Sequence, residues 1–296
     1  MTGSRAFLLA FLTAVLCTAG AQKAPNEKLA AAESAFAQLE PELERAQAQW
    51  EKTDARFALV DWTISHDLVV QRRLAGGNRF DGKRVIDVDL EHEDAARFGP
   101  HDKFTFSAWI RPTELTGAIL TRGVDVTEGE GYRLYLKDGK VQMNLVKSWV
   151  DDSLRVEAKC AIGLNLWHNA TVTYDGSGAA GGLKIYVDGQ PQKLKVNSSS
   201  LHSSFENKEP LRIGGGGGPE NRFRGQIRMV RIYRAALTPD EVAVLSTDTP
   251  VTALVQIPPE KRTAAESRKI RLYFLERNAP VNIREAWQRL CELRNR

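Results

Sequence analysis

The segment YRLYLKDGKVQMNLV, residues 132–146, carries the pattern that decides the fold. Two runs of alternating apolar and polar residues flank the tetrapeptide from Lys137 to Lys140, and Asp138-Gly139 at its centre is a strong signal for a tight turn. Alternation with a period of two places successive side chains on opposite faces of a strand. The segment is therefore predicted to form a β-hairpin.

The same period recurs on both sides of this hairpin, between about Leu59 and Leu245. FTFSAWIRP (104–112) alternates in the same way, and so do ATVTYDG (170–176) and LKIYVDGQ (183–190), which a glycine-rich turn joins. Many short strands, broken by Asp-Gly, Gly-Gly and Pro turns and without a long helix among them, are typical of an antiparallel sandwich. The sequence therefore predicts a mainly β fold with two packed sheets.

Five consecutive glycines in PLRIGGGGGPENRF (210–223) raise the question of a phosphate-binding loop. Such a loop leads into a helix and usually continues with a Lys and a Ser or Thr. Here Pro219, Glu220 and Asn221 follow, and the next stretch, FRGQIRMVRIY (223–233), is rich in β-branched and aromatic residues. The glycines are therefore predicted to connect two strands and not to hold a nucleotide.

The composition is ordinary for a globular protein. The 296 residues are 42% hydrophobic and 26% charged, enough for one large domain or two small ones. The formal charge of +4 is mild, and Lys and Arg are scattered along the chain instead of clustered. No nucleic-acid partner is therefore predicted.

The N-terminus has the features of a secretory signal peptide. Arg5 precedes an apolar core from Ala6 to Val15, and Ala19-Gly20-Ala21 offers a small-residue cleavage site before Gln22. The core is too short to remain as a membrane-spanning helix. The mature chain is expected to be secreted or periplasmic and not to span a membrane.

Removal of residues 1–21 leaves two cysteines, Cys160 and Cys291. They form neither a haem-attachment motif nor a Cys/His zinc pattern. An oxidising compartment permits a disulfide between them, but two separate thiols are the favoured interpretation.

Helices are predicted on both sides of the sandwich. From Leu29 to Trp50 apolar residues recur at heptad spacing, which indicates a helix with a packing seam that Pro41 kinks or splits. Three heptads would make at most a short coiled coil, so docking against another part of the protein is favoured. After the sandwich, TPDEVAVL (238–245) and TAAESRKIRLYFLERNAP (263–280) each open with a capping box.

These features divide the chain into four parts. They are a signal peptide (1–21), a helical N-terminal segment (22–58), the β-sandwich domain (59–247) and a helical C-terminal tail (248–296). The last segment, NIREAWQRLCELRNR, is helical in pattern to the final residue without a stop signal. The chain is therefore expected to be a piece of something longer.

An ordered series of motifs resembles the laminin G-like, concanavalin A-like jelly-roll family. The motifs are FDGKRVIDV (80–88), FTFSAWIRP, GYRLYLKDGKVQMNLV, WHNATVTYDGS (167–177), KIYVDGQ (184–190), LRIGGG (211–216) and FRGQIRMVRIYRAALTPDEV (223–242). VDWTISHDLVV (60–70) and IPPEKRTAAESRKIRLYFLERNAP (257–280) are similar to the version found inside large secreted cytochrome-c-associated proteins of planctomycete type. The resemblance implies a jelly-roll sandwich with further domains around it; this chain carries no haem motif.

The resemblance also implies one Ca²⁺ at a rim of the sandwich, held by two acidic side chains with carbonyls and waters. The family's first acid precedes the strand ahead of the Asp-Gly hairpin, where Asp125 stands. Its second acid precedes the L-x-I-G-G strand, where Glu206 stands instead of the family's Asp. The alternative is that both are solvated rim charges. A further cation position of many relatives is occupied here by Arg228, which argues against a second site.

Jelly rolls of this shape also include glycoside hydrolases, which need paired carboxylates on a strand. The nearest approach is VDLEHED (88–94), with the acids Asp89, Glu91, Glu93 and Asp94. This stretch has the polar character of a loop and lacks the required register. Hydrolysis is therefore the outside alternative, and the chain is predicted not to be an enzyme.

Three aromatic residues are candidates for a ligand platform: Trp149, Tyr135 and Trp109. Trp149 lies in a predicted loop with charged neighbours and is the first choice, whereas Trp109 lies on the strand face opposite the apolar one. The sequence thus predicts a recognition module that binds carbohydrate or an extracellular or periplasmic protein. The alternative is a structural domain that docks other parts of a secreted cytochrome-associated assembly.

Overall fold

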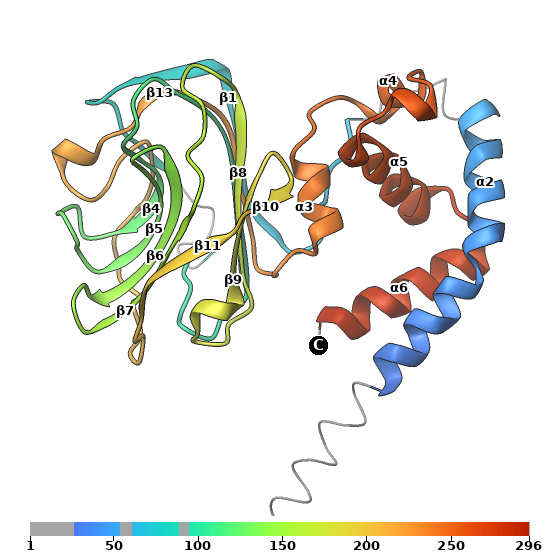
Figure 1. Cartoon of the computed structure of the whole chain (residues 1–296), viewed down its shortest axis with the longest axis horizontal. Coiled ribbons are helices and arrows are strands. Elements are labelled where there is room, and N and C mark those ends of the chain that lie inside the picture. The colour runs from blue at the N-terminus through green and yellow to red at the C-terminus, as the bar shows by residue number, and fades with distance from the viewer. Residues whose placement is uncertain (1–26, 54–60, 89–94, 296) are drawn as a thin grey trace, which may run out of the picture. The chain divides into compact units, whose positions relative to one another are not determined.

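The structure, a computed structural model, describes residues 27–53, 61–88 and 95–295 (Figure 1). The predicted signal peptide and residues 89–94, with the acids Asp89, Glu91, Glu93 and Asp94, lie outside these ranges. The described residues divide into two compact units. One, the helical unit, comprises the described residues up to Trp62, Pro250–Arg262 and the described residues from Ile270 onward. The other, the β unit, comprises Thr63–Thr249 with Thr263–Lys269.

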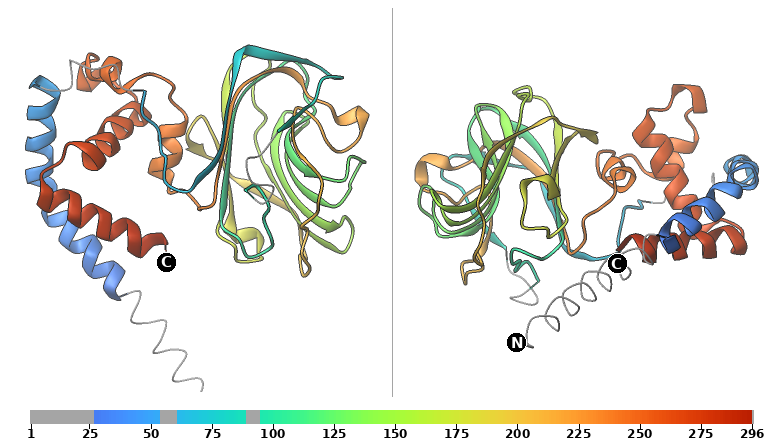
Figure 2. Two further views of the ribbon diagram at one scale, coloured as in Figure 1. Left: turned by 180° about the vertical axis from the view of Figure 1, so that it is seen from behind. Right: turned by 60° about the horizontal axis from the view of Figure 1, so that its bottom comes forward.

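The β unit is a sandwich of two antiparallel sheets, as predicted (Figure 2). In the described residues, one sheet has six strands in the order β1-β13-β3-β8-β9-β10, and the other has seven in the order β11-β7-β6-β5-β4-β12-β2. The strands are β1 (Leu68–Asp81), β2 (Ile86–Val88), β3 (Phe104–Pro112), β4 (Gly117–Gly123), β5 (Gly131–Lys137), β6 (Lys140–Ser148), β7 (Asp152–Ala158), β8 (His168–Tyr174), β9 (Leu183–Val187), β10 (Gln190–Pro191), β11 (Leu194–Ser199), β12 (Leu211–Ile213) and β13 (Arg224–Tyr233).

The predicted hairpin is β5 and β6. Asp138 and Gly139 have φ angles of 51° and 74°, the left-handed values that a two-residue hairpin turn needs at both positions. Leu136 pairs with Val141 next to the turn, and the apolar positions of both strands are buried. The polar positions of the same strands therefore lie on the outer face of the seven-stranded sheet.

Aromatic side chains join the two sheets across the core. Phe104 and Phe106 of β3 stack with ring centroids 4.5 Å apart, and Phe106 lies 4.9 Å from Tyr132 of β5. Phe98, in the segment before β3, contacts all three rings. All four residues are almost completely buried. Such packed aromatic pairs contribute stability beyond the area that they bury.

The five glycines connect β12 to β13, as predicted, through a short 3-10 turn at Pro219–Asn221. Gly214, Gly216, Gly217 and Gly218 have positive φ angles between 76° and 103°. The loop also lies close to its neighbours, because a Cβ on Gly216 would stand 2.1 Å from Oγ1 of Thr121. Both observations require glycine for backbone reasons.

Helix α3 (Pro239–Leu245) follows β13 within the β unit. Its predicted capping box is present. The Thr238 hydroxyl accepts a hydrogen bond from the backbone N–H of Glu241, whose carboxylate accepts one from the N–H of Thr238. These bonds satisfy N–H groups that the first helical turn leaves without partners.

The helical unit contains helical residues 27–38, α2 (Glu40–Thr53), α4 (Val251–Val255), the later part of α5 (Ala264–Arg277), and α6 (Val281–Asn295). A turn at Leu39 separates the first two helices, and Pro41 is the second residue of α2. The predicted seam packs on the C-terminal helices, because Phe36 contacts Trp287 of α6 and Trp50 contacts Phe274 of α5. No described helix is both long and apolar enough to cross a membrane.

Candidate functional site

A cavity of about 480 Å³ opens on the outer face of the seven-stranded sheet. Its lining comes from β5, β6, β7 and β11, from the turn after β6 and from the glycine-rich loop (Figure 1). The lining residues are Thr116, Thr127, Glu128, Arg133, Tyr135, Lys137, Asp138, Lys140, Gln142, Asn144, Trp149, Arg155, Glu157, Lys195, Asn197, Gly217 and Asn221. This surface is polar and hydrogen-bonding, with two aromatic side chains.

Glu157 of β7 is the carboxylate on the cavity floor. Its Oε2 accepts hydrogen bonds from Gln142 Nε2 at 2.9 Å and Asn197 Nδ2 at 3.0 Å, while Oε1 accepts one from Lys195 Nζ at 3.2 Å. Lys140 Nζ lies 3.8 Å from Oε1. Burial opposes ionisation of Glu157, but the hydrogen bonds from Asn197 and Lys195 outweigh it and lower the pKa of the carboxyl group. Glu157 is therefore a fixed anion with its own partners.

Arg133 of β5 is a buried cation, with 3% of its surface exposed. Its Nη2 donates to the carbonyl oxygens of Val124 at 3.1 Å and Val126 at 3.3 Å. Among the described residues, Nε has no hydrogen-bond partner. Burial lowers the pKa of the guanidinium, which nevertheless stays charged at neutral pH. The charges of Asp125 and Glu128 act on this group from a distance, but no carboxylate of the described residues makes the direct ion pair that usually offsets desolvation.

Arg155 of β7 lies over the indole ring of Trp149, with its guanidinium carbon 3.9 Å from the ring centre. Its Nε donates to the Ser153 hydroxyl at 3.2 Å, and that hydroxyl donates in turn to the Trp149 carbonyl at 3.2 Å. This cation–π contact holds an aromatic side chain that belongs to a turn.

Tyr135 of β5 lines the cavity beside the glycine-rich loop. Its hydroxyl donates to Oδ1 of Asn221, whose Nδ2 donates to the Gly217 carbonyl at 2.5 Å. Burial raises the pKa of Tyr135 to about 12, so the hydroxyl remains a hydrogen-bond donor at neutral pH. The glycine-rich loop thus forms one wall of the cavity.

The structure brings together two of the three predicted platform residues. Trp149 and Tyr135 line the same cavity. Trp109, on β3, belongs to the other sheet, where its Nε1 donates to the Leu245 carbonyl of α3 at 3.1 Å. The guanidinium of Arg228 lies 4.1 Å from the Trp109 ring centre. Trp109 is therefore half covered by its own domain and contributes nothing to the cavity.

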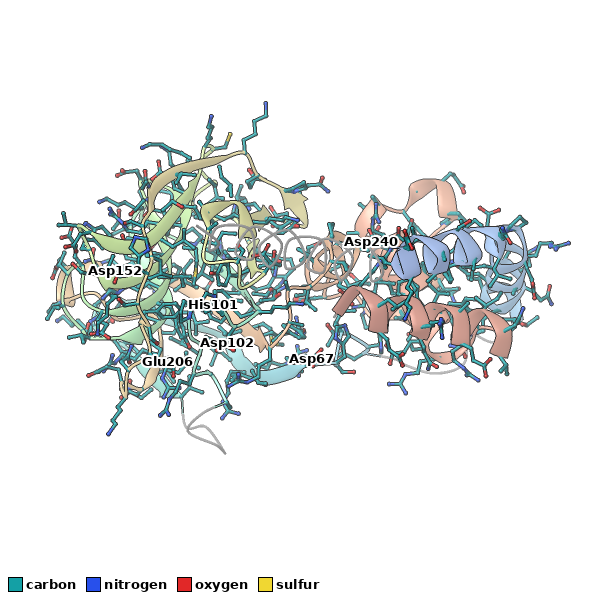
Figure 3. The ribbon with its side chains drawn as sticks, turned by 90° about the horizontal axis from the view of Figure 1, so that it is seen from below. Asp67, His101, Asp102, Asp152, Glu206 and Asp240 are labelled. Atoms are coloured by element: carbon teal, nitrogen blue, oxygen red, sulfur yellow. The ribbon has the colours of Figure 1, made fainter. Side chains whose placement is uncertain are left out.

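The two predicted calcium ligands have different surroundings. Asp125 accepts hydrogen bonds from Arg222 Nη2 at 2.6 Å and from the Gly218 N–H at 3.0 Å. Glu206 lies beside Gly99, close to Asp102 (Figure 3). No contact joins Asp125 to Glu206, and the described residues contain no group of three or more His, Cys, Asp or Glu that could hold a metal. The calcium site stays a prediction.

The floor of the cavity was not among the sequence-derived candidates. Arg133, Gln142 and Asn144 occupy the polar positions of the β5–β6 hairpin. The alternation in the sequence therefore marks them as facing away from the core. Arg155 and Glu157 continue this face on β7. The signal available in the sequence was the run of amides and charges on one face of consecutive strands.

The match to a family model agrees with the fold. A family model described as "Concanavalin A-like lectin/glucanases superfamily" matches residues 87–243, slightly more than half of the chain. Among solved structures, the binding domain of Paraclostridial Mosquitocidal Protein 1 is similar at 17% identity and a TM-score of 0.43, over 61% of this chain and 52% of that one. The chain thus spans about half of that protein's length.

Two sialidase structures show a similar level of likeness. The Ruminococcus gnavus IT-sialidase CBM40, bound to α2,3 sialyllactose, is 18% identical with a TM-score of 0.46, over 60% of this chain and 99% of that one. The NanB sialidase from Streptococcus pneumoniae is 10% identical with a TM-score of 0.46, over 60% of this chain and 28% of that one. The family match spans most of the two-sheet sandwich described above, and the chain belongs to the concanavalin A-like lectin/glucanases superfamily.

Proposed function

We propose that this chain is an exported, non-catalytic module that binds carbohydrate in the cavity on the seven-stranded sheet. The observation that carries the proposal is the composition of the cavity wall, in which Trp149 and Tyr135 accompany a floor of amides and charges. Sugars present apolar ring faces together with hydroxyl groups that donate and accept hydrogen bonds. Sites with a few fixed polar groups and aromatic walls suit such ligands. Membership of a superfamily of lectins and glucanases agrees with this ligand class.

Asn144 offers a hydrogen-bonding group that the protein itself leaves available. Only 4% of the residue is exposed, yet its side chain lines the cavity and makes no hydrogen bond within the described part of the chain. An amide that lines a cavity and bonds to no described residue is available to water or to a ligand. A sugar hydroxyl could serve as donor and acceptor at this position.

The carboxylates of the cavity support binding over hydrolysis. A glycosidase needs a carboxylic acid that is protonated near neutral pH, and therefore a raised pKa. The pKa of Glu157 is lowered instead, and both of its oxygens accept hydrogen bonds. Glu128 and Asp138 lie exposed at the rim. Docking within a cytochrome-associated assembly stays the alternative derived from the sequence.

A glycan and polysaccharide array probed with the purified protein tests the proposal. We expect selective binding that Asn144→Ala weakens, because the substitution removes both an acceptor and a donor from the cavity floor. Lys184→Ala is the matched control, since Lys184 is an exposed residue of β9 in the other sheet. Binding that Asn144→Ala leaves unchanged, with the variant folded, would place the saccharide elsewhere. No binding to any saccharide would contradict the proposed function.

A further inference from the structure

The cavity holds more positive than negative charge. Its lining contains five cationic side chains and three carboxylates. The cations are Arg133, Lys137, Lys140, Arg155 and Lys195, and the carboxylates are those of Glu128, Asp138 and Glu157. The whole chain has a formal charge of only +4, so this small surface carries a local excess.

The arrangement of ion pairs leaves two arginines without a carboxylate. Glu157 is matched by two lysines, Lys195 at 3.2 Å and Lys140 at 3.8 Å. Arg133 donates to backbone carbonyls and Arg155 to the Ser153 hydroxyl. Neither guanidinium makes an ion pair with any carboxylate of the described residues.

One acid at the rim acts on both arginines from a distance. The charge of Glu128 favours the charged form of Arg133 and of Arg155, but Glu128 is exposed to solvent. Its field is therefore screened, and it does not replace a direct partner. A ligand anion would compete with Glu128 for the same two cations.

Guanidinium groups match planar or tetrahedral oxyanions particularly well. Arginine presents its donors in a rigid fork that bonds to two oxygens of a carboxylate or sulfate at once. At Arg155 this fork lies against the Trp149 ring, so the cation and an apolar surface adjoin each other. A sugar ring that bears an acidic substituent combines the two matching features.

We propose that the saccharide recognised by this cavity is acidic, with its carboxylate or sulfate group against Arg155 and beside Arg133. This inference rests on the proposed function and specifies its ligand class. The ring and its hydroxyls would meet Trp149 and the amide of Asn144. An acidic peptide would satisfy the same charges, and the measurement with poly-glutamate below separates it from a saccharide.

Three polymers test the class of ligand: polygalacturonate, chondroitin sulfate, and polygalacturonate whose carboxylates have been reduced to neutral alcohols. Binding to the purified protein is measured by calorimetry in EDTA, at low and high ionic strength. We expect at least one acidic polymer to bind and the neutral polymer to bind at least about tenfold more weakly, as for the loss of a charged hydrogen bond. High salt should weaken the acidic interaction.

Three substitutions, each of which alters one charge, separate the site from general electrostatics. Arg155→Gln should weaken binding of the acidic polymer about tenfold. Lys184→Gln removes the same charge from the other sheet and should leave that binding nearly unchanged. Glu128→Gln should strengthen binding, because it removes the competing anion. This gain keeps the test decisive even where Arg155→Gln lowers stability.

Different failures have different meanings. The acidic ligand class would be overturned if the neutral polymer bound as tightly as the acidic one, or if neither Arg155→Gln nor Glu128→Gln changed the affinity. A site for neutral carbohydrate would then still be possible. Poly-glutamate binding with the same affinity and the same dependence on Arg155 would assign an acidic peptide and overturn the saccharide. If the protein binds no saccharide on the array, both the carbohydrate-binding function and the acidic ligand class are contradicted.

Discussion

Arg155 covers the ring of Trp149 at 3.9 Å, so a cation from strand β7 fixes an aromatic side chain of the turn that precedes that strand. The turn is held further by the hydrogen bond from Ser153 to the Trp149 carbonyl. A side chain that is oriented before the ligand arrives loses less conformational freedom on binding. The pair therefore supplies the cavity with a pre-organised aromatic surface.

The two predicted tryptophans should separate binding from stability. Trp149→Ala is expected to weaken saccharide binding by about 2 kcal/mol, as for a central aromatic contact, with little change in unfolding because Trp149 lies in a surface turn. Trp109→Ala should lower the free energy of unfolding by about 2–3 kcal/mol, because it removes the contacts with Leu245 and Arg228, and should leave binding intact. Calorimetry and urea unfolding of both variants measure the two effects. The reverse pattern would show that the saccharide binds on the other sheet and not in the cavity.

The glycine-rich loop makes a second prediction. Gly216 has a φ of 103°, and a Cβ there would meet Thr121 Oγ1 at 2.1 Å, so Gly216→Ala should destabilise the protein by more than about 2 kcal/mol. Gly181→Ala is the control, because no atom of the described residues lies within 4 Å of its Cβ position. Thermal or urea unfolding compares the two. Equal stabilities would mean that the loop relaxes at no cost and that its glycines are not needed for the backbone.

The two-sheet sandwich could be predicted from the sequence because the patterns that indicate strands and turns are local. The alternation in residues 132–146 and the Asp138-Gly139 turn need no information from elsewhere in the chain, and both were confirmed. The polar positions of that hairpin could be recognised as outward-facing in the same way. Their conversion into a cavity depends on β7 lying next to β6 and on β11 lying next to β7, and the sequence does not specify sheet order.

The surroundings of the predicted site residues also depend on parts of the chain that are distant in sequence. Asp125 lies 97 positions before its partner Arg222, and no local pattern around either residue predicts that they pair. Trp109 and Trp149 both have the pattern of exposed aromatics, but α3 packs over only one of them. Side-chain partners that are distant in sequence therefore decided which candidates share a site.

Calcium binding can be tested by a third measurement. A bound ion that stabilises only the folded state raises the melting temperature once its concentration exceeds the dissociation constant, on the order of 10⁻⁴ to 10⁻³ M for extracellular modules. If Asp125 is a ligand, Ca²⁺ should raise the melting temperature of the wild type above its value in EDTA and should not raise that of Asp125→Ala. Asp125→Ala should also lose about 1–3 kcal/mol without calcium, because Arg222 and Gly218 lose their partner. No effect of Ca²⁺ on the wild type would leave Asp125 with a structural role alone.

The pH dependence of stability provides the last prediction, through His66. Its Nε2 lies 2.7 Å from the Glu241 carboxylate of α3, and Nδ1 lies 3.1 Å from Asp67. The hydrogen bond with Glu241, opposed by burial and aided by the charges of both acids, raises the pKa of His66 from its ordinary value of 6.5 to about 9. The folded state therefore holds this proton more tightly than the unfolded chain does.

The sign of the effect follows from that difference. The stabilisation is fully present below pH 6.5, the ordinary pKa of a histidine, and it is lost as the pH rises through about 9. Because the imidazole is 43% exposed, solvent screening reduces the contribution to on the order of 1 kcal/mol. His66→Gln should therefore be less stable than the wild type near neutral pH. The difference in the free energy of unfolding between the two proteins, the gap, should disappear in alkaline buffer. Urea unfolding across this range, repeated at high salt where the gap should shrink, measures it. A constant gap at all pH values would show that His66 acts through packing and not through its charge.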